Sequence, residues 1–402
     1  MFTEADENMA FGTKILESGA YFEEPYDHPE ALPIHLSTAH NVEDLNALLE
    51  RYKKNGHCYN RNSNPNRTAL SRLMSTIEGG EASQGFNCGM AAISTAILAN
   101  CKKGDHILSD KTLYGETLEI FTDIVAKYGV ETDFIDFTDL DAVRKGVKDN
   151  TAILYTETVS NPLISVPNLK EIAEIAHSVN ALLIVDNTFM TGALVRPLSL
   201  GADLVVNSLT KFANGHSDAL CGSVTGSKEL IDKIYHFQIL LGTEANVFDT
   251  WLTMRGIRTL ELRIQKQSEN AAAVAAALEK NPYVKRVFHP SLESSPFHAV
   301  AAAETGGKYY GGMLTIEIQL CVGLFKCLFK ISHQISGILN TNRNTNHAVC
   351  NANGIALLSR QVVMRRERWI GHRSSVSAQC HCIMHQLQFP NEAVHLVQII
   401  LQ

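Results

Sequence analysis

The chain has 402 residues, 45% of them hydrophobic, which is enough for two or more domains, and its formal net charge of −7 argues against a nucleic-acid or anionic-membrane partner. No apolar run approaches the ~20 residues of a membrane span, and the acidic start lacks the basic and apolar regions of a signal peptide. The nine cysteines are scattered without CxxC pairs, which is typical of free thiols in a reducing cytosol, so we expect a cytoplasmic protein.

After an irregular start, the chain alternates between helical and strand-like segments. Residues 1–60 are polar and proline-containing, with a short predicted helix at 42–54, and we interpret them as an N-terminal arm. Residues 61–245 contain predicted helices at 67–80, 90–104 and 169–180, and short β-rich runs at 106–110, 131–137, 152–158, 181–187 and 202–208. Strands without clean alternation, separated by helices, predict an α/β fold with a mostly parallel sheet covered on both faces.

Near residue 245 the rhythm changes. One long helical tract at 246–280 is followed by predicted strands at 283–290 and 311–318. These segments indicate a second, smaller α/β domain at 246–402.

The composition changes again after about Ile318. Residues 319–402 hold eight Lys and Arg against two Asp and Glu, so this tail carries +6 while residues 1–318 carry −13. We expect the tail to pack poorly, with a helix at 322–339 and an irregular asparagine-rich stretch at 340–354. A shifted reading frame after Ile318 is the economical explanation, and a divergent C-terminal domain is the alternative.

A crowded group of thiols and imidazoles lies near the end of this tail. Two cysteines at i, i+2 with histidines this close fit zinc spacing poorly, so we predict no metal site. The residues concerned are Cys380, His381, Cys382 and His385.

Polar residues follow several of the predicted strands, at the edge where ligands bind in open parallel sheets. The run "ALLIVDN" ends in Asp186, and "ADLVVNSLTK" ends in Ser208, Thr210 and Lys211. The segment "EASQGFNCGM" leads through Gly89 and Met90 into a helix.

Each of these residues also has an ordinary structural interpretation. Asp186 could cap the next helix, Lys211 could extend to solvent, and Gly89 could serve only a turn. Together, however, a glycine before a helix N-terminus with nearby hydroxyls suits a phosphate. A neighbouring carboxylate can hold a protonated ring nitrogen, and a lysine can form a Schiff base with an aldehyde. These are the requirements of pyridoxal 5'-phosphate.

The order of motifs along the chain resembles the Cys/Met-metabolism, or transsulfuration, family of fold-type I pyridoxal-phosphate enzymes. The resemblance rests on "YNRNSNP", "NCGMAAI", "LYGET", "ETVSNPL", "VDNTF", "RPLSLGADLVVNSLTKFANGHSD" and "GGML", between about residues 11 and 318. It implies the aspartate aminotransferase-like fold of those enzymes. The C-terminal ~84 residues do not match the family pattern.

The resemblance implies a role for each matched position around the cofactor. Lys211 matches the Schiff-base lysine and Asp186 the partner of the pyridine nitrogen. Ser208 and Thr210 match hydroxyls near the phosphate, and Gly89 with Met90 matches its backbone cradle.

Further positions match residues that surround the ring or join subunits. Tyr114 matches the ring that stacks on the pyridine and can act as an acid or base, and Asn161 matches a contact to the cofactor ring. Tyr59 and Arg61 match a pair that reaches the phosphate of a neighbouring subunit, which implies a homodimer or homotetramer. Arg373 in "RSSVSAQ" echoes the arginine that binds the substrate carboxylate, although the glycine and acidic residue that normally follow are missing.

The family resemblance implies a lyase for small sulfur amino acids. γ-Elimination on methionine, homocysteine or cystathionine would give a 2-oxo acid, ammonia and a thiol. The alternatives are a γ-replacement enzyme, such as cystathionine γ-synthase or O-acetylhomoserine sulfhydrylase, and a catalytically impaired relative that keeps the fold. Glu116 stands where methionine γ-lyases typically carry a cysteine, which counts against a strict methionine γ-lyase. A nucleotide-binding dehydrogenase is disfavoured because no G-x-G-x-x-G follows the early strands.

Overall fold

The computed structural model describes residues 9–18, 31–54, 56–318, 331, 334, 335, 380–389 and 392–401. The chain forms two compact units. The first comprises Met1–Ser160 with Val166–Leu262, and the second Asn161–Ser165 with Arg263–Gln402. The predicted division at residues 60 and 245 stays a prediction. Within the described part of the chain, no helix has the length and apolar content that crossing a membrane requires.

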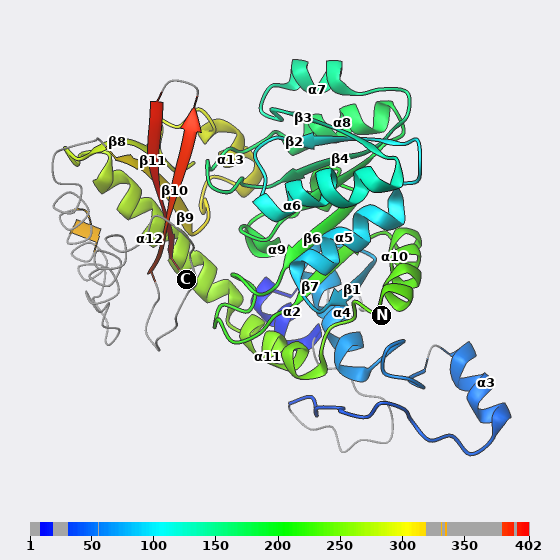
Figure 1. The fold of residues 1–402 in the computed structure, drawn as a ribbon. Helices are drawn as coiled ribbons and strands as arrows, with labels where there is room; N and C mark the ends of the chain where they lie inside the picture. The colour runs from blue at the N-terminus through cyan, green and yellow to red at the C-terminus, as the bar shows by residue number, and fades with distance from the viewer. Residues whose placement is uncertain are drawn as a thin grey trace, which may run out of the picture. The chain divides into compact units, whose positions relative to one another are not determined.

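A seven-stranded sheet forms the centre of the first unit (Figure 1). Neighbouring strands β6, β5, β4, β2 and β3 run parallel, whereas β7 is antiparallel to both β6 and β1. This confirms the mostly parallel sheet. In spatial order the strands are β1 (Ala82–Phe86), β7 (Gly222–Gly226), β6 (Leu204–Ser208), β5 (Leu182–Asp186), β4 (Thr151–Glu157), β2 (His106–Asp110) and β3 (Glu131–Ile135).

Helices and helical turns separate these strands along the chain. The α-helices are α2 (Phe11–Ser18), α3 (Leu45–Lys53), α4 (Pro65–Glu78), α5 (Gly89–Asn100), α6 (Gly115–Glu119), α7 (Leu140–Gly146), α8 (Leu169–Ser178), α9 (Thr191–Leu194) and α10 (Lys228–Leu241). A π-helical turn, Ile120–Ile124, and 3-10 turns at Val125–Tyr128 and Pro197–Leu200 complete the set. As predicted, Gly79 closes α4: it is the C-cap that follows Glu78, and it adopts the left-handed conformation that glycine tolerates. By contrast, α5 ends at Asn100, short of the predicted Gly104, because Cys101 is extended.

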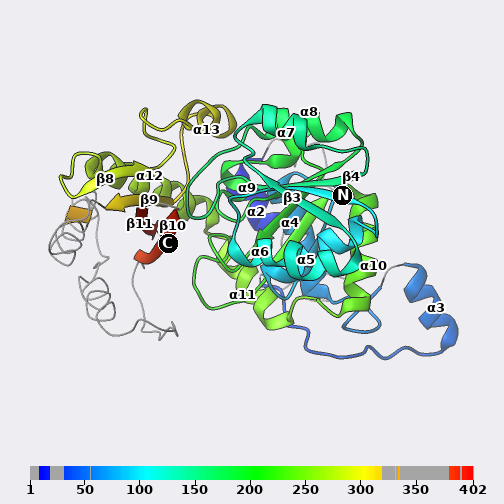
Figure 2. The same ribbon diagram turned by 45° about the horizontal axis from the view of Figure 1, so that its top comes forward.

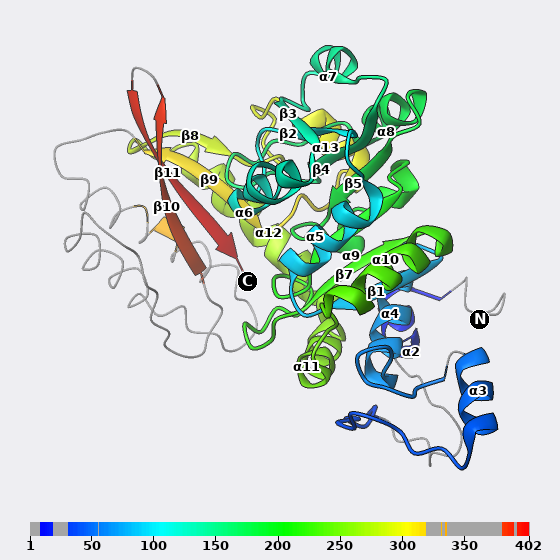
Figure 3. The same cartoon turned by 45° about the vertical axis from the view of Figure 1, so that its right-hand side comes forward.

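Both faces of the sheet are covered, and alternate strand residues divide between them. Ile153 and Tyr155 of β4 pack into the core shared with α5 and α10, whereas Leu154 packs into the core shared with α7 and α8. Likewise Ile184 of β5 faces α5, while Leu183 faces α8. Figure 3 shows α5 and α10 side by side, and Figure 2 shows α7 beside α8. Because strand side chains alternate, each position near a strand end can be assigned to a face.

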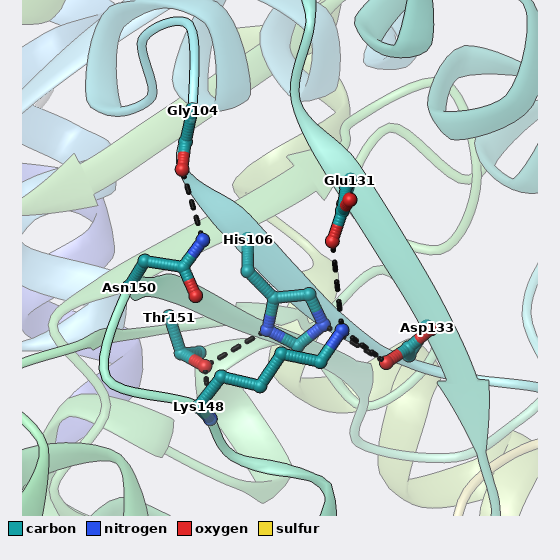
Figure 4. Close-up of polar contacts among 7 residues, drawn as sticks. All are labelled: Gly104, His106, Glu131, Asp133, Lys148, Asn150 and Thr151. Atoms are coloured by element: carbon teal, nitrogen blue, oxygen red, sulfur yellow. Dashed lines mark hydrogen bonds and ion pairs between the residues drawn. The ribbon is translucent and has the colours of Figure 1, made fainter.

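A polar network closes the amino ends of β2 and β4 (Figure 4). The buried His106 places Nδ1 2.8 Å from Thr151 Oγ1, which also accepts a 2.7 Å hydrogen bond from the backbone of Lys148. The Lys148 amine forms an ion pair of 2.8 Å with Asp133 of β3. Burial and the Lys148 charge lower the pKa of His106. This edge of the sheet is therefore held by internal pairing.

The predicted single helical tract at 246–280 is wrong in one respect, because it contains two helices, α11 (Val247–Ile257) and α12 (Leu260–Leu278). Gly256 is near the end of α11. A Cβ there would lie 2.3 Å from the carbonyl oxygen of Asn214, so this end of the helix packs directly against another part of the backbone. The backbone N–H and hydroxyl of Thr259 both donate to the Gly256 carbonyl, which interrupts the regular helical bonding.

The second unit contains a four-stranded antiparallel sheet and the helix α13 (His298–Thr305). Its strands are β8 (Val284–Phe288), β9 (Met313–Ile318), β10 (Cys380–Phe389) and β11 (Glu392–Leu401), with β11 paired to both β9 and β10. The sequence predicted no strand in the tail, whereas the structure places β10 and β11 there. Ile331 and Ile335 are helical and buried, in agreement with the predicted helix at 322–339. The asparagine-rich stretch at 340–354 lies outside the described residues.

Candidate active site

The last residues of three adjacent parallel strands bring polar side chains to one face of the sheet. Glu157 of β4 is paired in register with Asp186 of β5, and β6 ends at Ser208. Each stands two or four positions beyond a residue of the core beneath α5, so strand alternation directs all three toward the α5 face. This carboxyl edge is where open parallel sheets place their ligands.

Thr188 links Asp186 to Ser208. Its backbone N–H donates to Asp186 Oδ1 at 2.9 Å, and its hydroxyl is also hydrogen-bonded to the Asp186 carboxyl. The Thr188 Oγ1 accepts a 2.8 Å hydrogen bond from the backbone N–H of Ser208. Asp186 does not cap the next helix, because the N-cap of α9 is Met190. The geometry thus fixes a carboxyl group and a hydroxyl group on one edge.

Asp186 is buried, with 8% of the residue exposed. Burial raises the pKa of its carboxyl to about 6, although both Thr188 hydrogen bonds lower that pKa. A carboxylate in this position would be stabilised by a cationic partner on the α5 face. A protonated ring nitrogen is such a partner.

Lys211 follows β6 and leaves its amine accessible. Its backbone N–H donates to the Ser208 carbonyl at 3.3 Å, and its carbonyl accepts from Gly215 at 2.8 Å, so the turn is held at both ends. The side chain is exposed, and its amine forms no hydrogen bond or ion pair with any residue that the structure describes. Thr210 is held in place because its hydroxyl donates to the Cys221 carbonyl at 3.3 Å.

The N-terminus of α5 lies against the end of β6. A Cβ on Gly89 would stand 2.6 Å from Ser208 Cβ, so only glycine allows this approach. Cys88 is the N-cap but makes no side-chain capping hydrogen bond, which leaves the first-turn N–H groups, including that of Met90, available to an anion. Gly89 begins a helix here, so its role is not that of a turn glycine.

Tyr114 is attached to the same edge through its backbone. Its N–H donates to Glu157 Oε1 at 2.8 Å. Burial and the carboxylate of Glu116, which is hydrogen-bonded to the Tyr114 hydroxyl, raise the pKa of that hydroxyl. The tyrosine is therefore kept protonated and is tied to the strand next to Asp186.

The other candidates from the sequence are Tyr59, Arg61, Asn161 and Arg373. The Arg61 guanidinium donates to the Ile239 carbonyl at 2.7 Å and lies 5.6 Å from the Tyr59 ring centroid. Asn161 belongs to the second unit. Arg373 lies outside the described residues.

Sequence reasoning singled out neither Thr188 nor Glu157, although both stand inside the motifs "VDNTF" and "ETVSNPL". Both residues lie at the end of an apolar run or just after it, and this position was the signal that could have identified them. Their side-chain partners depend on neighbouring strands, which the motif itself does not specify.

A comparison with protein families finds a match for most of the chain. Residues 12–334 match the model of the family described as Cys/Met metabolism PLP-dependent enzyme. The chain belongs to this family. Its members bind pyridoxal phosphate, and the match extends beyond the predicted break at Ile318.

Two Bacillus subtilis relatives in the family are lyases. Cystathionine beta-lyase is 39% identical over 262 residues, which cover 65% of this chain and 66% of the relative. Cystathionine gamma-lyase is 40% identical over 264 residues, covering 65% and 69%. The match thus spans about two thirds of the length of these relatives.

A solved structure of a Campylobacter jejuni protein named O-acetylhomoserine (thiol)-lyase is also similar. Its TM-score is 0.72 with 28% identity, over 77% of this chain and 85% of that chain. That protein carries N'-pyridoxyl-lysine-5'-monophosphate.

The residues of the carboxyl edge fit pyridoxal phosphate. Lys211 supplies an accessible amine without a partner among the described residues, and Asp186 supplies a buried carboxyl. Gly89 opens a helix N-terminus whose close approach to Ser208 a side chain would block. An amine, an acid and an anion site on one edge are what this cofactor needs.

Proposed function

We propose that the protein is a pyridoxal-phosphate-dependent carbon–sulfur lyase. It performs γ-elimination on methionine, homocysteine or cystathionine and releases a 2-oxo acid, ammonia and a thiol. The proposal rests on the accessible amine of Lys211. This lysine follows β6, at the same edge of the sheet as Asp186 and the N-terminus of α5. The similarity to a cystathionine gamma-lyase at 40% identity supports elimination.

The chain's own groups divide the work of binding and proton transfer. Bound pyridoxal phosphate supplies an electron sink that stabilises negative charge at the substrate α carbon. The Lys211 amine would hold the cofactor, and its Nζ would accept the α proton of the substrate. Asp186 keeps the ring nitrogen protonated.

Four groups bind the phosphate in this proposal. The backbone of Gly89 and Met90 at the start of α5 supplies N–H donors, and Ser208 and Thr210 supply hydroxyls. Gly89 opens α5 and approaches Ser208 at the end of β6 directly.

Tyr114 would lie against the cofactor ring, and its hydroxyl would supply a proton to the leaving group. The Glu116 carboxylate supports this role because it raises the pKa of the Tyr114 hydroxyl and keeps the proton in place at neutral pH. Asn161 contributes a further contact to the cofactor ring, and Arg373 binds the substrate carboxylate.

The active enzyme is at least a homodimer, in which Tyr59 and Arg61 complete a neighbouring subunit's phosphate site. What supports this is the exposed apolar surface of the preceding helix. In α3, Leu45, Leu49 and Tyr52 are each at least half exposed, and they repeat at helical spacing.

Two other functions have an observation in their favour. γ-Replacement is supported by the similarity to the O-acetylhomoserine (thiol)-lyase structure. A catalytically impaired relative is supported by the end of the family match at residue 334, which leaves Arg373 outside it.

Product analysis separates the three. The purified protein is incubated with cystathionine, homocysteine or methionine, and 2-oxo acid, ammonia and thiol are measured. A parallel reaction supplies O-acetylhomoserine with sulfide. Release of 2-oxo acid without an added nucleophile supports the lyase, whereas product formation only with sulfide contradicts it. Cofactor binding without either product identifies the impaired relative.

A further inference from the structure

A fully buried carboxylate lies on the sheet face opposite the cofactor groups. Glu78 ends α4 and is 0% exposed. Its Oε1 accepts hydrogen bonds from the Asn207 amide and the Gly192 backbone N–H, and its Oε2 accepts one from the Asn187 amide; all three are 3.0 Å long. No part of the proposed reaction uses this group.

The two asparagines are immediate neighbours of the proposed cofactor residues. Asn187 follows Asp186, and Asn207 precedes Ser208. Because consecutive strand side chains point to opposite faces, the asparagines face Glu78 while Asp186 and Ser208 face α5. Glu78 therefore connects the carboxyl ends of β5 and β6 on the sheet face opposite α5.

The hydrogen bonds around Glu78 favour its ionised form, because all three partners are donors. The guanidinium of Arg196 adds a favourable charge from nearby. Burial raises the pKa of Glu78 to about 7, so the charge is held there at an energetic cost.

Asn187 cannot reverse its amide freely to accept a different partner. The same Nδ2 that donates to Glu78 also donates to the Val195 carbonyl at 2.9 Å. The Asn187 backbone N–H donates to the Val206 carbonyl at 2.8 Å, which connects it to β6. The arrangement of Asn187 thus depends on an acceptor at position 78.

We infer that Glu78 is a positioning residue for the cofactor site, because it fixes the ends of β5 and β6 and so the placement of Asp186 relative to Ser208. The inference rests on the proposed roles of those two residues. It assigns to Glu78 no contact with cofactor or substrate.

The test is Glu78→Gln, which keeps the size but replaces one oxygen by an N–H₂ group that opposes a donor. The apoprotein is titrated with pyridoxal phosphate, and the dissociation constant and the pH dependence of the bound cofactor's absorbance are measured. We expect the dissociation constant to rise on the order of tenfold. We also expect the pH dependence of the absorbance to move, because Asp186 is displaced.

Thr151→Val is the matched control. Thr151 is also buried in a polar network, but at the amino ends of the strands, the edge opposite the site (Figure 4). It should lower the melting temperature while leaving the dissociation constant and absorbance unchanged. If Glu78→Gln and Thr151→Val lower the melting temperature equally and show the same dissociation constant and absorbance of the cofactor, the role of Glu78 is purely structural.

Two further variants keep the inference separate from the proposed site. If Glu78→Gln fails to fold, Asn207→Ser removes one donor and should show the same changes in a weaker form; unchanged cofactor binding there contradicts the inference. Asp186→Asn is titrated in parallel. If Asp186→Asn binds the cofactor normally, the proposed site is wrong; if only the Glu78 and Asn207 variants bind normally, the inference alone fails.

Discussion

Replacing Asp186 by asparagine should make the apoprotein more stable at neutral pH. The pKa of the buried carboxyl is raised from 3.8 to about 6 in the folded state, while the unfolded chain keeps a pKa near 3.9. The folded protein therefore binds the extra proton between these values. Its contribution to stability is present below about pH 4 and is lost as pH rises through about 6. At about 1.4 kcal/mol per pH unit, this loss is on the order of 3 kcal/mol.

The assay is urea unfolding of the apoprotein from about pH 4 to pH 7. The free energy of unfolding of Asp186→Asn should gain about 3 kcal/mol relative to wild type across this range. Asp149→Asn, on an exposed side chain that forms no ion pair with any described residue, is the control and should follow wild type. Parallel curves for wild type and Asp186→Asn would refute the reasoning.

The same substitution should weaken function. The ring nitrogen of pyridoxal phosphate would lose the anion that keeps it protonated, so cofactor affinity should fall. The barrier to turnover should rise by about 2.7–4 kcal/mol, the usual cost of removing a preorganised electrostatic partner. An unchanged turnover number would show that Asp186 is not the nitrogen partner. Stability and catalysis are thus expected to move in opposite directions.

Three other substitutions test the remaining groups. Lys211→Ala should leave the melting temperature nearly unchanged, because the side chain is exposed, but mass spectrometry after borohydride reduction should find no pyridoxyl-lysine; an adduct at wild-type yield would show that another lysine carries the cofactor. Gly89→Ala would place Cβ 2.6 Å from Ser208 Cβ, so it should cost about 1–3 kcal/mol of stability and weaken cofactor binding in a fluorescence titration; normal binding would exclude this helix end as the phosphate site. Glu116→Gln removes a charge that raises the pKa of the Tyr114 hydroxyl, so the alkaline limb of the kcat/KM profile should move to lower pH; an unmoved limb would mean that Tyr114 does not titrate in the reaction.

The sequence predicted the parts of the fold that depend on local pattern. Apolar runs located β2 to β6, and the order of helices and strands indicated a mostly parallel sheet. Lys211 and Asp186 could be found because both follow such runs directly, and strand ends are where this class of sheet binds ligands. The motifs then supplied the family, which the match over residues 12–334 confirms.

Elements without an apolar run escaped prediction. The strand β1 reads "ASQGF" and β7 reads "GSVTG". β1 is held by pairing with β7, and β7 by pairing with both β1 and β6, rather than by their own composition. At the break between α11 and α12, Thr259 donates to the Gly256 carbonyl, and Gly256 itself packs against the backbone of Asn214. Such long-range contacts leave no periodic signal.

Glu78 shows the same limit at the level of a single residue. In "STIEGG" it reads as the last residue of a surface helix before its glycine cap, and charged residues there are usually solvated. Only the fold shows that three donors from Asn187, Gly192 and Asn207 surround it. A buried charge is recognisable from sequence only when its partners are local, and these partners lie more than a hundred residues away.

Burial has the same effect on two acidic groups near the carboxyl edge. Burial raises the pKa of Glu78 to about 7 and that of Asp186 to about 6, so both charges are costly in the free protein. Glu78 is compensated by donors of the chain itself, and Glu157 in part by the backbone of Tyr114. Among the described residues, Thr188 is the donor to Asp186. Glu78 is stabilised by three donors on its own face of the sheet, whereas a protonated ring nitrogen on the α5 face would stabilise the Asp186 carboxylate, which supports Asp186 as the proposed partner of the ring.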